Sequence, residues 1–142
     1  MKNPIRILIL EDQTWDLDLT LMHLSQAGFD PIWTCVDKKD DYLAHLHDDL
    51  EIILADFQLP QFNALHALQY LKESRLDIPF IVVSGTISEE VAVQCMKLGA
   101  ADYLLKDRMT RLGWDNKTAR ARAGRKKVRR GVGRVIAPKS PG

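Results

Sequence analysis

Short apolar runs alternate with longer amphipathic stretches along the first three quarters of the chain. Nearly continuous apolar runs predict strands that are buried on both faces, whereas apolar residues three or four positions apart predict helices. The runs predict five strands, at residues 5–10, 31–36, 52–55, 79–83 and 101–105. Each of the first four strands is followed by a convincing helical pattern.

The four helical patterns lie between residues 14 and 28, 37 and 48, 63 and 74, and 88 and 99. Thr14 and Asn63 are predicted N-caps, and Gly28 and Gly99 are predicted helix ends. The apolar positions predicted for the first helix are Trp15, Leu17, Leu21, Met22 and Leu24. Regular alternation of strand and helix predicts an α/β fold with a doubly wound parallel sheet, because parallel neighbours need crossover helices.

Polar side chains follow four of the five predicted strands. Glu11 and Asp12 follow the first strand, Asp56 the third, Ser84 the fourth and Lys106 the fifth. The carboxyl ends of parallel strands share one edge of the sheet, and open α/β sheets bind their ligands there. We therefore expect these five side chains to lie close together.

A cluster of this composition suits phosphoryl transfer. Three converging carboxylates need a cation, because like charges raise one another's pKa. Carboxylate oxygens are ligands that Mg²⁺ prefers, and Lys106 adds a fixed positive charge. Asp56 can then accept a phosphoryl group as an aspartyl phosphate, with the Ser84 hydroxyl donating to one of its oxygens.

Each of these residues alone also has a structural interpretation. An acid after a strand often caps the next helix, and a lone serine or lysine in a loop is commonly a turn or solvated residue. Five such residues at the ends of four strands favour the functional interpretation. A magnesium-dependent hydrolase on the same fold is a further alternative, but no extra general base stands out in the sequence.

The ordered motifs resemble the receiver domain of two-component response regulators over about residues 5–110. The motifs that carry the resemblance are Glu11-Asp12, Asp56 with Pro60, Ser84-Gly85, the segment 99–103 and Lys106. The resemblance implies a flavodoxin-like (βα)5 fold. It also implies that Asp56 accepts a phosphoryl group from a histidine kinase or phosphotransfer protein.

The resemblance assigns roles to further residues. The Mg²⁺ ligands that it implies are Glu11, Asp12, Asp56 and the backbone carbonyl of Gln58. Ser84 and Lys106 would contact the phosphoryl group, and Tyr103 would turn inward as an aromatic switch when Ser84 moves. One departure is Asp107, which follows Lys106 where the family usually has a proline.

Charge divides the chain into two parts. Residues 1–110 hold 9 Lys and Arg against 18 Asp and Glu, whereas residues 111–142 hold 11 against 1. The segment after Met109 is too poor in large apolar residues for more than a weak or frayed fifth helix. We therefore predict a receiver domain over residues 1–112 and a basic, largely disordered tail over residues 113–142.

The basic tail leaves an alternative function open. It could bind nucleic acid through its charge, with the receiver fold as a scaffold. Because charge runs are usually solvated, the leading hypothesis is a phosphoaccepting signalling domain that is not an independent enzyme and forms a monomer or weak homodimer. Residues 1–4 lack the apolar stretch typical of a signal peptide, and the apolar runs are shorter than a bilayer span requires, so we expect a cytoplasmic protein.

Overall fold

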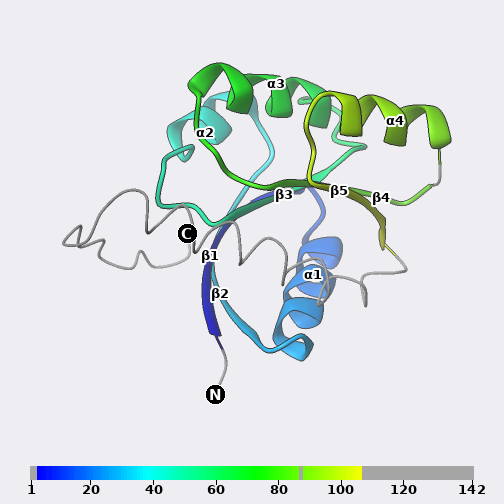
Figure 1. The fold of residues 1–142 in the computed structure, drawn as a ribbon. Helices are drawn as coiled ribbons and strands as arrows, with labels where there is room; N and C mark the ends of the chain where they lie inside the picture. The colour runs from blue at the N-terminus through cyan, green and yellow to red at the C-terminus, as the bar shows by residue number, and fades with distance from the viewer. Residues whose placement is uncertain (1–2, 87, 107–142) are drawn as a thin grey trace.

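The computed structural model describes residues 3–86 and 88–106, which form one parallel sheet flanked by helices on both faces (Figure 1). The sheet has five strands in the order β2-β1-β3-β4-β5. The strands are β1 (Asn3–Leu10), β2 (Phe29–Val36), β3 (Ile52–Asp56), β4 (Phe80–Ser84) and β5 (Asp102–Leu105). The predicted flavodoxin-like arrangement of five parallel strands is therefore confirmed.

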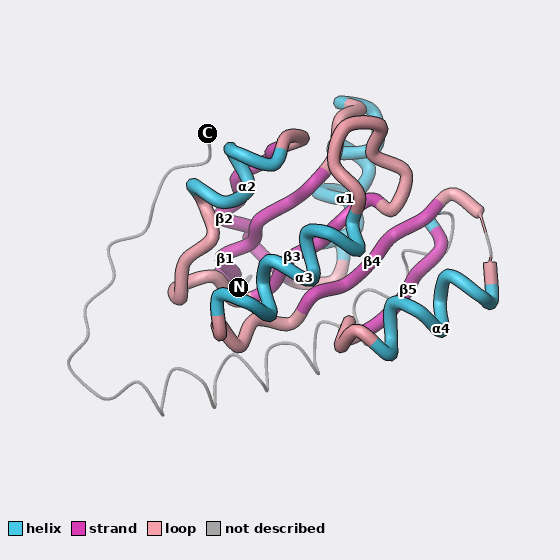
Figure 2. Tube along the Cα trace, turned by 90° about the horizontal axis from the view of Figure 1, so that it is seen from above, coloured by secondary structure: helices cyan, strands magenta, loops and turns pink. Residues whose placement is uncertain are grey.

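Four helices connect these strands. They are α1 (Thr14–Gln26), α2 (Lys39–Ala44), α3 (Ala64–Ser74) and α4 (Glu89–Lys97). Figure 1 shows α1 on one face of the sheet and α2, α3 and α4 on the other, and Figure 2 shows α3 and α4 running roughly along the direction of the strands. This division is the doubly wound arrangement that the alternating pattern predicts.

The central strands β1, β3 and β4 are apolar on both faces because each face of the sheet has its own core. On β1, Leu8 and Leu10 join the core beneath α2, α3 and α4, whereas Ile5, Ile7 and Ile9 join the core that packs on α1. Successive side chains of a strand point to opposite faces, so a central strand covered on both sides needs an unbroken apolar run. The two cores hold the central strands in place, so the ends of these strands have defined positions.

The start of α1 differs from the sequence prediction. Gln13 is the N-cap, without a side-chain cap hydrogen bond, and Thr14 is the first helical residue. Trp15 is 82% exposed, whereas Leu17 and Leu21 pack against the core. Trp15 precedes Leu17 by two positions, or about 200° around the helix, so it faces away from the sheet.

Helix α2 is shorter than the predicted span of residues 37–48, because it ends at Ala44. The following residues form a turn in which the Leu50 amide donates to the His47 carbonyl, and the side chains of His47 and Asp49 form an ion pair. Asp49 is buried. Extending the helix to residue 48 would break these local contacts. The spacing of apolar residues could not predict them.

Several predictions lie outside the described residues. They concern the fifth helix, the tail over residues 113–142 and the peptide bond between Lys106 and Asp107. Within the part of the chain that the structure describes, no helix is both long enough and apolar enough to cross a membrane.

The predicted N-cap of α3 is confirmed and gives a test of the fold. The Asn63 side chain accepts a hydrogen bond of 2.6 Å from the Leu65 amide. Loss of an N-cap acceptor leaves an amide of the first turn without its partner. We expect Asn63→Ala to lower the free energy of unfolding by about 1 kcal/mol, measured by urea denaturation.

Gln13→Ala is the matched control, because Gln13 is also an N-cap but its side chain makes no cap hydrogen bond. This change should alter the free energy of unfolding by about 0.5 kcal/mol or less. Equal losses in the two variants would contradict the assigned role of the Asn63 side chain.

Candidate functional site

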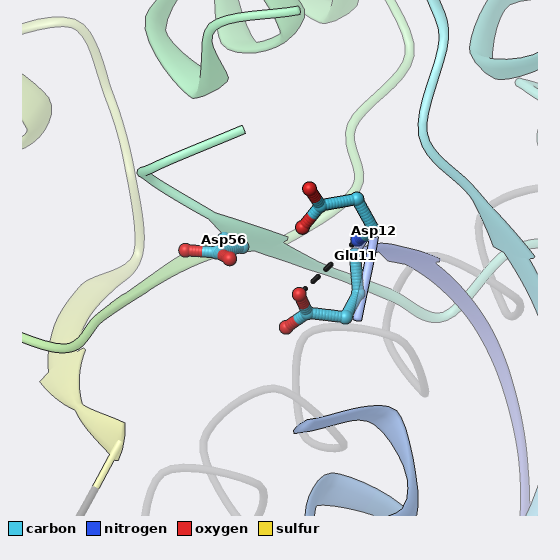
Figure 3. A group of neighbouring side chains, drawn as sticks. All are labelled: Glu11, Asp12 and Asp56. Carbon is cyan, nitrogen blue, oxygen red and sulfur yellow. Dashed lines mark hydrogen bonds between the residues drawn. The ribbon is translucent and has the colours of Figure 1, made fainter. Parts of the chain in front are cut away.

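The carboxyl ends of β1 and β3 bring three acids together. Leu10 is level with Ala55 in the parallel pairing of these adjacent strands, so Glu11 and Asp56 leave the sheet side by side. One carboxylate oxygen from each of Glu11, Asp12 and Asp56 lies within 4.8 Å of the other two. Figure 3 shows these side chains around the ends of the two strands. The predicted convergence of the three acids is thus observed.

Local backbone amides orient the Glu11 side chain. Its Oε2 atom accepts hydrogen bonds from the amides of Asp12, at 3.1 Å, and Gln13, at 3.2 Å. The first of these bonds is drawn as a dashed line in Figure 3. Its other oxygen, Oε1, lies 3.5 Å from the Lys106 ammonium. Glu11 thus folds back over the start of the loop and keeps one oxygen toward the cluster.

Asp56 is the last residue of β3 and is 5% exposed. Its Oδ1 atom accepts a hydrogen bond of 3.0 Å from the Gln58 amide, and its Oδ2 atom accepts one of 3.1 Å from Lys106 Nζ. The Phe57 amide donates to the Val83 carbonyl at 2.8 Å, which extends the pairing of β3 with β4 past Asp56. The carboxylate is therefore held on a rigid strand end.

Lys106 follows β5 and contacts three carboxylates. Its ammonium donates to Asp16 at 2.7 Å and to Asp56 at 3.1 Å, and it forms an ion pair with Glu11. Burial acts to lower the pKa of Lys106, but the hydrogen bonds to Asp16 and Asp56 and the charges of Asp56 and Glu11 outweigh it and raise the pKa. Lys106 therefore stays positively charged at neutral pH.

Glu11 has a raised pKa, caused first by burial and then by a neighbouring negative charge. Burial and the adjacent charge of Asp56 raise the pKa of Glu11 to about 7, although Lys106 and the Gln13 amide act in the opposite direction. One lysine among several carboxylates leaves an excess of negative charge, and protonation of Glu11 relieves part of it.

The three acids fit a magnesium ion in ligand type and nearly in spacing. Mg²⁺ binds oxygen ligands at about 2.0–2.1 Å, so two oxygens on one ion are at most about 4.2 Å apart. The span of 4.8 Å among the three carboxylate oxygens exceeds this only slightly. Small side-chain rotations would close the set, and a divalent cation would offset the excess negative charge.

Ser84 ends the strand next to Asp56, and the backbone of Thr86 joins it to Tyr103. The Thr86 amide donates to Ser84 Oγ at 3.2 Å, and the Tyr103 hydroxyl donates to the Thr86 carbonyl at 3.1 Å. Ser84 ends β4 and is buried, whereas Tyr103 on β5 is partly buried. The Ser84 side chain makes its described hydrogen bond to Thr86, not to Asp56.

Sequence reasoning missed two participants. Asp16 makes the shortest contact with Lys106, yet it lies within α1 and follows no strand. The sequence signals Asp16 only weakly, as an acid in the first turn of the predicted helix that follows Glu11 and Asp12. Thr86 takes part through its backbone, so its residue type carries no signal for this contact.

The sequence matches the model of a known protein family. Residues 7–112 match the family model described as the response regulator receiver domain. This match covers most of the chain, and the protein therefore belongs to the receiver-domain family.

The chain is also similar to individual members of that family. It is 27% identical over 100 residues to the response regulator SaeR of Staphylococcus aureus, a match that covers 70% of this chain and 43% of SaeR. The chain thus spans less than half the length of this curated relative.

Two solved structures show the same fold. A DNA-binding response regulator of the LuxR family from Staphylococcus aureus matches with a TM-score of 0.70 and 17% identity, over 81% of this chain and 98% of that structure. A response regulator receiver domain protein from Clostridium thermocellum matches with a TM-score of 0.70 and 19% identity, over 87% and 98%. At these identities the structural likeness concerns the fold alone.

The raised pKa of Glu11 predicts a pH dependence of stability in the metal-free protein. The folded state holds a proton on Glu11 up to about pH 7, whereas the unfolded state loses it near the ordinary value of 4.5. Between these values the folded state binds more protons, so the contribution of Glu11 to stability falls as pH rises. We expect Glu11→Gln to lose less stability than wild type between about pH 5 and pH 8, measured by urea denaturation with a chelator present.

Glu90→Gln is the control for this experiment, because Glu90 is exposed in the first turn of α4, away from the cluster. Between the two pH values, the free energy of unfolding of Glu90→Gln should change by the same amount as that of the wild type. If Glu11→Gln also keeps that change, Glu11 does not titrate near neutral pH in the folded protein.

Proposed function

We propose that this receiver domain accepts a phosphoryl group on Asp56 from a phosphohistidine of a histidine kinase or phosphotransfer protein, in a magnesium-dependent reaction. The observation that carries this proposal is the position of Asp56, whose carboxylate contacts Lys106 at 3.1 Å and shares a group of three acids with Glu11 and Asp12. Membership of the receiver family supports the same role.

The chemistry requires a nucleophile and positive charge. A carboxylate oxygen of Asp56 attacks the phosphorus, the bond from phosphorus to the donor imidazole breaks, and its electron pair stays on that nitrogen. Lys106 stabilises the negative charge on the transferring group, and the Gln58 amide holds Asp56 in place. The reaction needs no general base, because Asp56 attacks as a carboxylate.

Glu11, Asp12, Asp56 and the backbone carbonyl of Gln58 are the residues that would hold the metal. A bound Mg²⁺ supplies further positive charge beside the phosphoryl oxygens. Glu11 keeps Oε1 on the side of the cluster, while its Oε2 is occupied by two backbone amides. Glu11 must also release any proton before it binds a cation, because metal ligation by a carboxylate requires the ionised form.

A signalling role needs a second conformation, and the Thr86 backbone offers a route to it. The Thr86 amide donates a hydrogen bond to Ser84, and the Thr86 carbonyl accepts one from Tyr103. If the Ser84 hydroxyl turns to a phosphoryl oxygen, it weakens its bond to the Thr86 amide, and a shift of Thr86 releases the Tyr103 hydroxyl. Phosphorylation would then bias the position of Tyr103, as an equilibrium between two states requires.

This role makes the domain a phosphoaccepting switch that catalyses its own phosphorylation and dephosphorylation. We propose that its output is a contact with another protein whose affinity depends on the state of Tyr103. The description of one structural relative as DNA-binding belongs to that protein.

The proposal predicts the site of modification. After incubation with Mg²⁺ and a small phosphodonor such as acetyl phosphate, the wild-type protein should gain one base-labile phosphoryl group, detected by intact mass. Asp56→Asn should gain none, because an amide oxygen is a far weaker nucleophile than a carboxylate.

Asp37→Asn is the matched control. Asp37 also follows a strand, β2, but it lies outside the group of three acids. This variant should be modified as the wild type is. An unmodified wild type, or equal modification of Asp56→Asn, would contradict the proposal.

A further inference from the structure

The Lys106 ammonium lies near three carboxylates and donates hydrogen bonds to two of them, Asp16 and Asp56. It has three N–H donors, and the carboxylate oxygens near it belong to Asp16, at 2.7 Å, Asp56, at 3.1 Å, and Glu11, at 3.5 Å. Glu11 and Asp56 belong to the proposed phosphoryl site. Asp16 does not, and it makes the shortest of the three contacts.

Asp16 is held in this position by the helix that carries it. It lies in the first turn of α1, where the helix dipole favours a negative charge. The side chains of Asp16 and Lys106 are 26% and 21% exposed, so the pair is only partly screened by water. The two residues are 90 positions apart in the sequence, and their contact joins α1 to the end of β5.

A phosphoryl group on Asp56 would need the same ammonium. It would bring more negative charge than the carboxylate it replaces and would present new oxygens to Lys106. A lysine that keeps a short contact with Asp16 has fewer N–H donors and less unpaired charge to offer those oxygens. If Lys106 turns fully to the phosphoryl group, the contact with Asp16 is lost.

We propose that Asp16 competes with the phosphoryl group for the Lys106 ammonium. This competition weakens the interaction of Lys106 with the phosphoryl oxygens. Asp16 is thus a positioning residue that acts through Lys106. The inference rests on the proposed function, because it concerns the phosphorylated state of Asp56. Asp16, a residue of α1, would thus lower the affinity of the site for a phosphoryl group or its analogue.

Beryllium fluoride with saturating Mg²⁺ tests this inference, because it adds to a carboxylate oxygen as a stable analogue of a phosphoryl group. Its dissociation constant can be measured by ¹⁹F NMR. Asp16→Asn removes the charge but keeps the size of the side chain. We expect it to bind the analogue about two- to fivefold more tightly than wild type, the range of a partly exposed ion pair.

Two variants control for general effects. Asp18→Asn removes the same charge from an exposed position of α1 and should leave the affinity at the wild-type value. Asp16→Glu keeps the carboxylate and should bind closer to wild type than Asp16→Asn does. Equal tightening by Asp18→Asn would mean that general charge on α1 is responsible, and would overturn the inference.

A double-mutant cycle tests whether Asp16 acts through Lys106. In a Lys106→Met background, Asp16→Asn should no longer tighten binding. Persistence of the full effect there would indicate direct repulsion of the analogue and would overturn the inference.

The remaining outcomes separate the inference from the proposed function. Unchanged or weaker binding by Asp16→Asn, in a series whose wild type binds, would overturn the inference alone, since it would mean that Asp16 is neutral or favourably orients Lys106. Absence of binding by the wild type would overturn the proposed function and the inference with it.

Discussion

The arrangement of the candidate site depends on one ammonium group shared among carboxylates. Lys106 lies against Asp56, Glu11 and Asp16, which come from the ends of β3 and β1 and from α1. The lysine itself follows β5, at the edge of the sheet. These interactions bring four separate segments to one point, and the positive charge lets buried acids lie close together. Burial of Glu11 and the adjacent charge of Asp56 raise the pKa of Glu11, and the same excess of negative charge would favour a bound cation.

The parallel sheet makes this convergence possible. Its two apolar cores hold the strands in register, so residues that follow β1, β3, β4 and β5 share one edge. The polar groups there need no long loops to reach one another. The Thr86 backbone joins Ser84 to Tyr103 by two hydrogen bonds, and the proposed switch role of Tyr103 rests on this link.

The strand ends, and the convergence of Glu11, Asp12 and Asp56 at one edge of the sheet, could be predicted from the sequence. Contacts that depend on how a helix packs could not. The runs before Glu11 and Asp56 marked both strand ends, and Asn63 marked the start of α3. The contact between Asp16 and Lys106 depends on how α1 packs against the sheet, which no local pattern records. Helix α2 ends at Ala44, and the following turn holds a contact between the side chains of His47 and Asp49 that no local pattern records either.

NMR observation of two backbone amides at the site tests most directly whether Asp56 is phosphorylated and whether the change reaches Thr86. The Gln58 amide donates to Asp56, and the Thr86 amide donates to Ser84. When a small phosphodonor is added to protein already saturated with Mg²⁺, both signals should shift and then return as the phosphoryl group is hydrolysed, whereas neither should shift in Asp56→Asn. Signals that stay unchanged in the wild type, or that shift equally in Asp56→Asn, would contradict it.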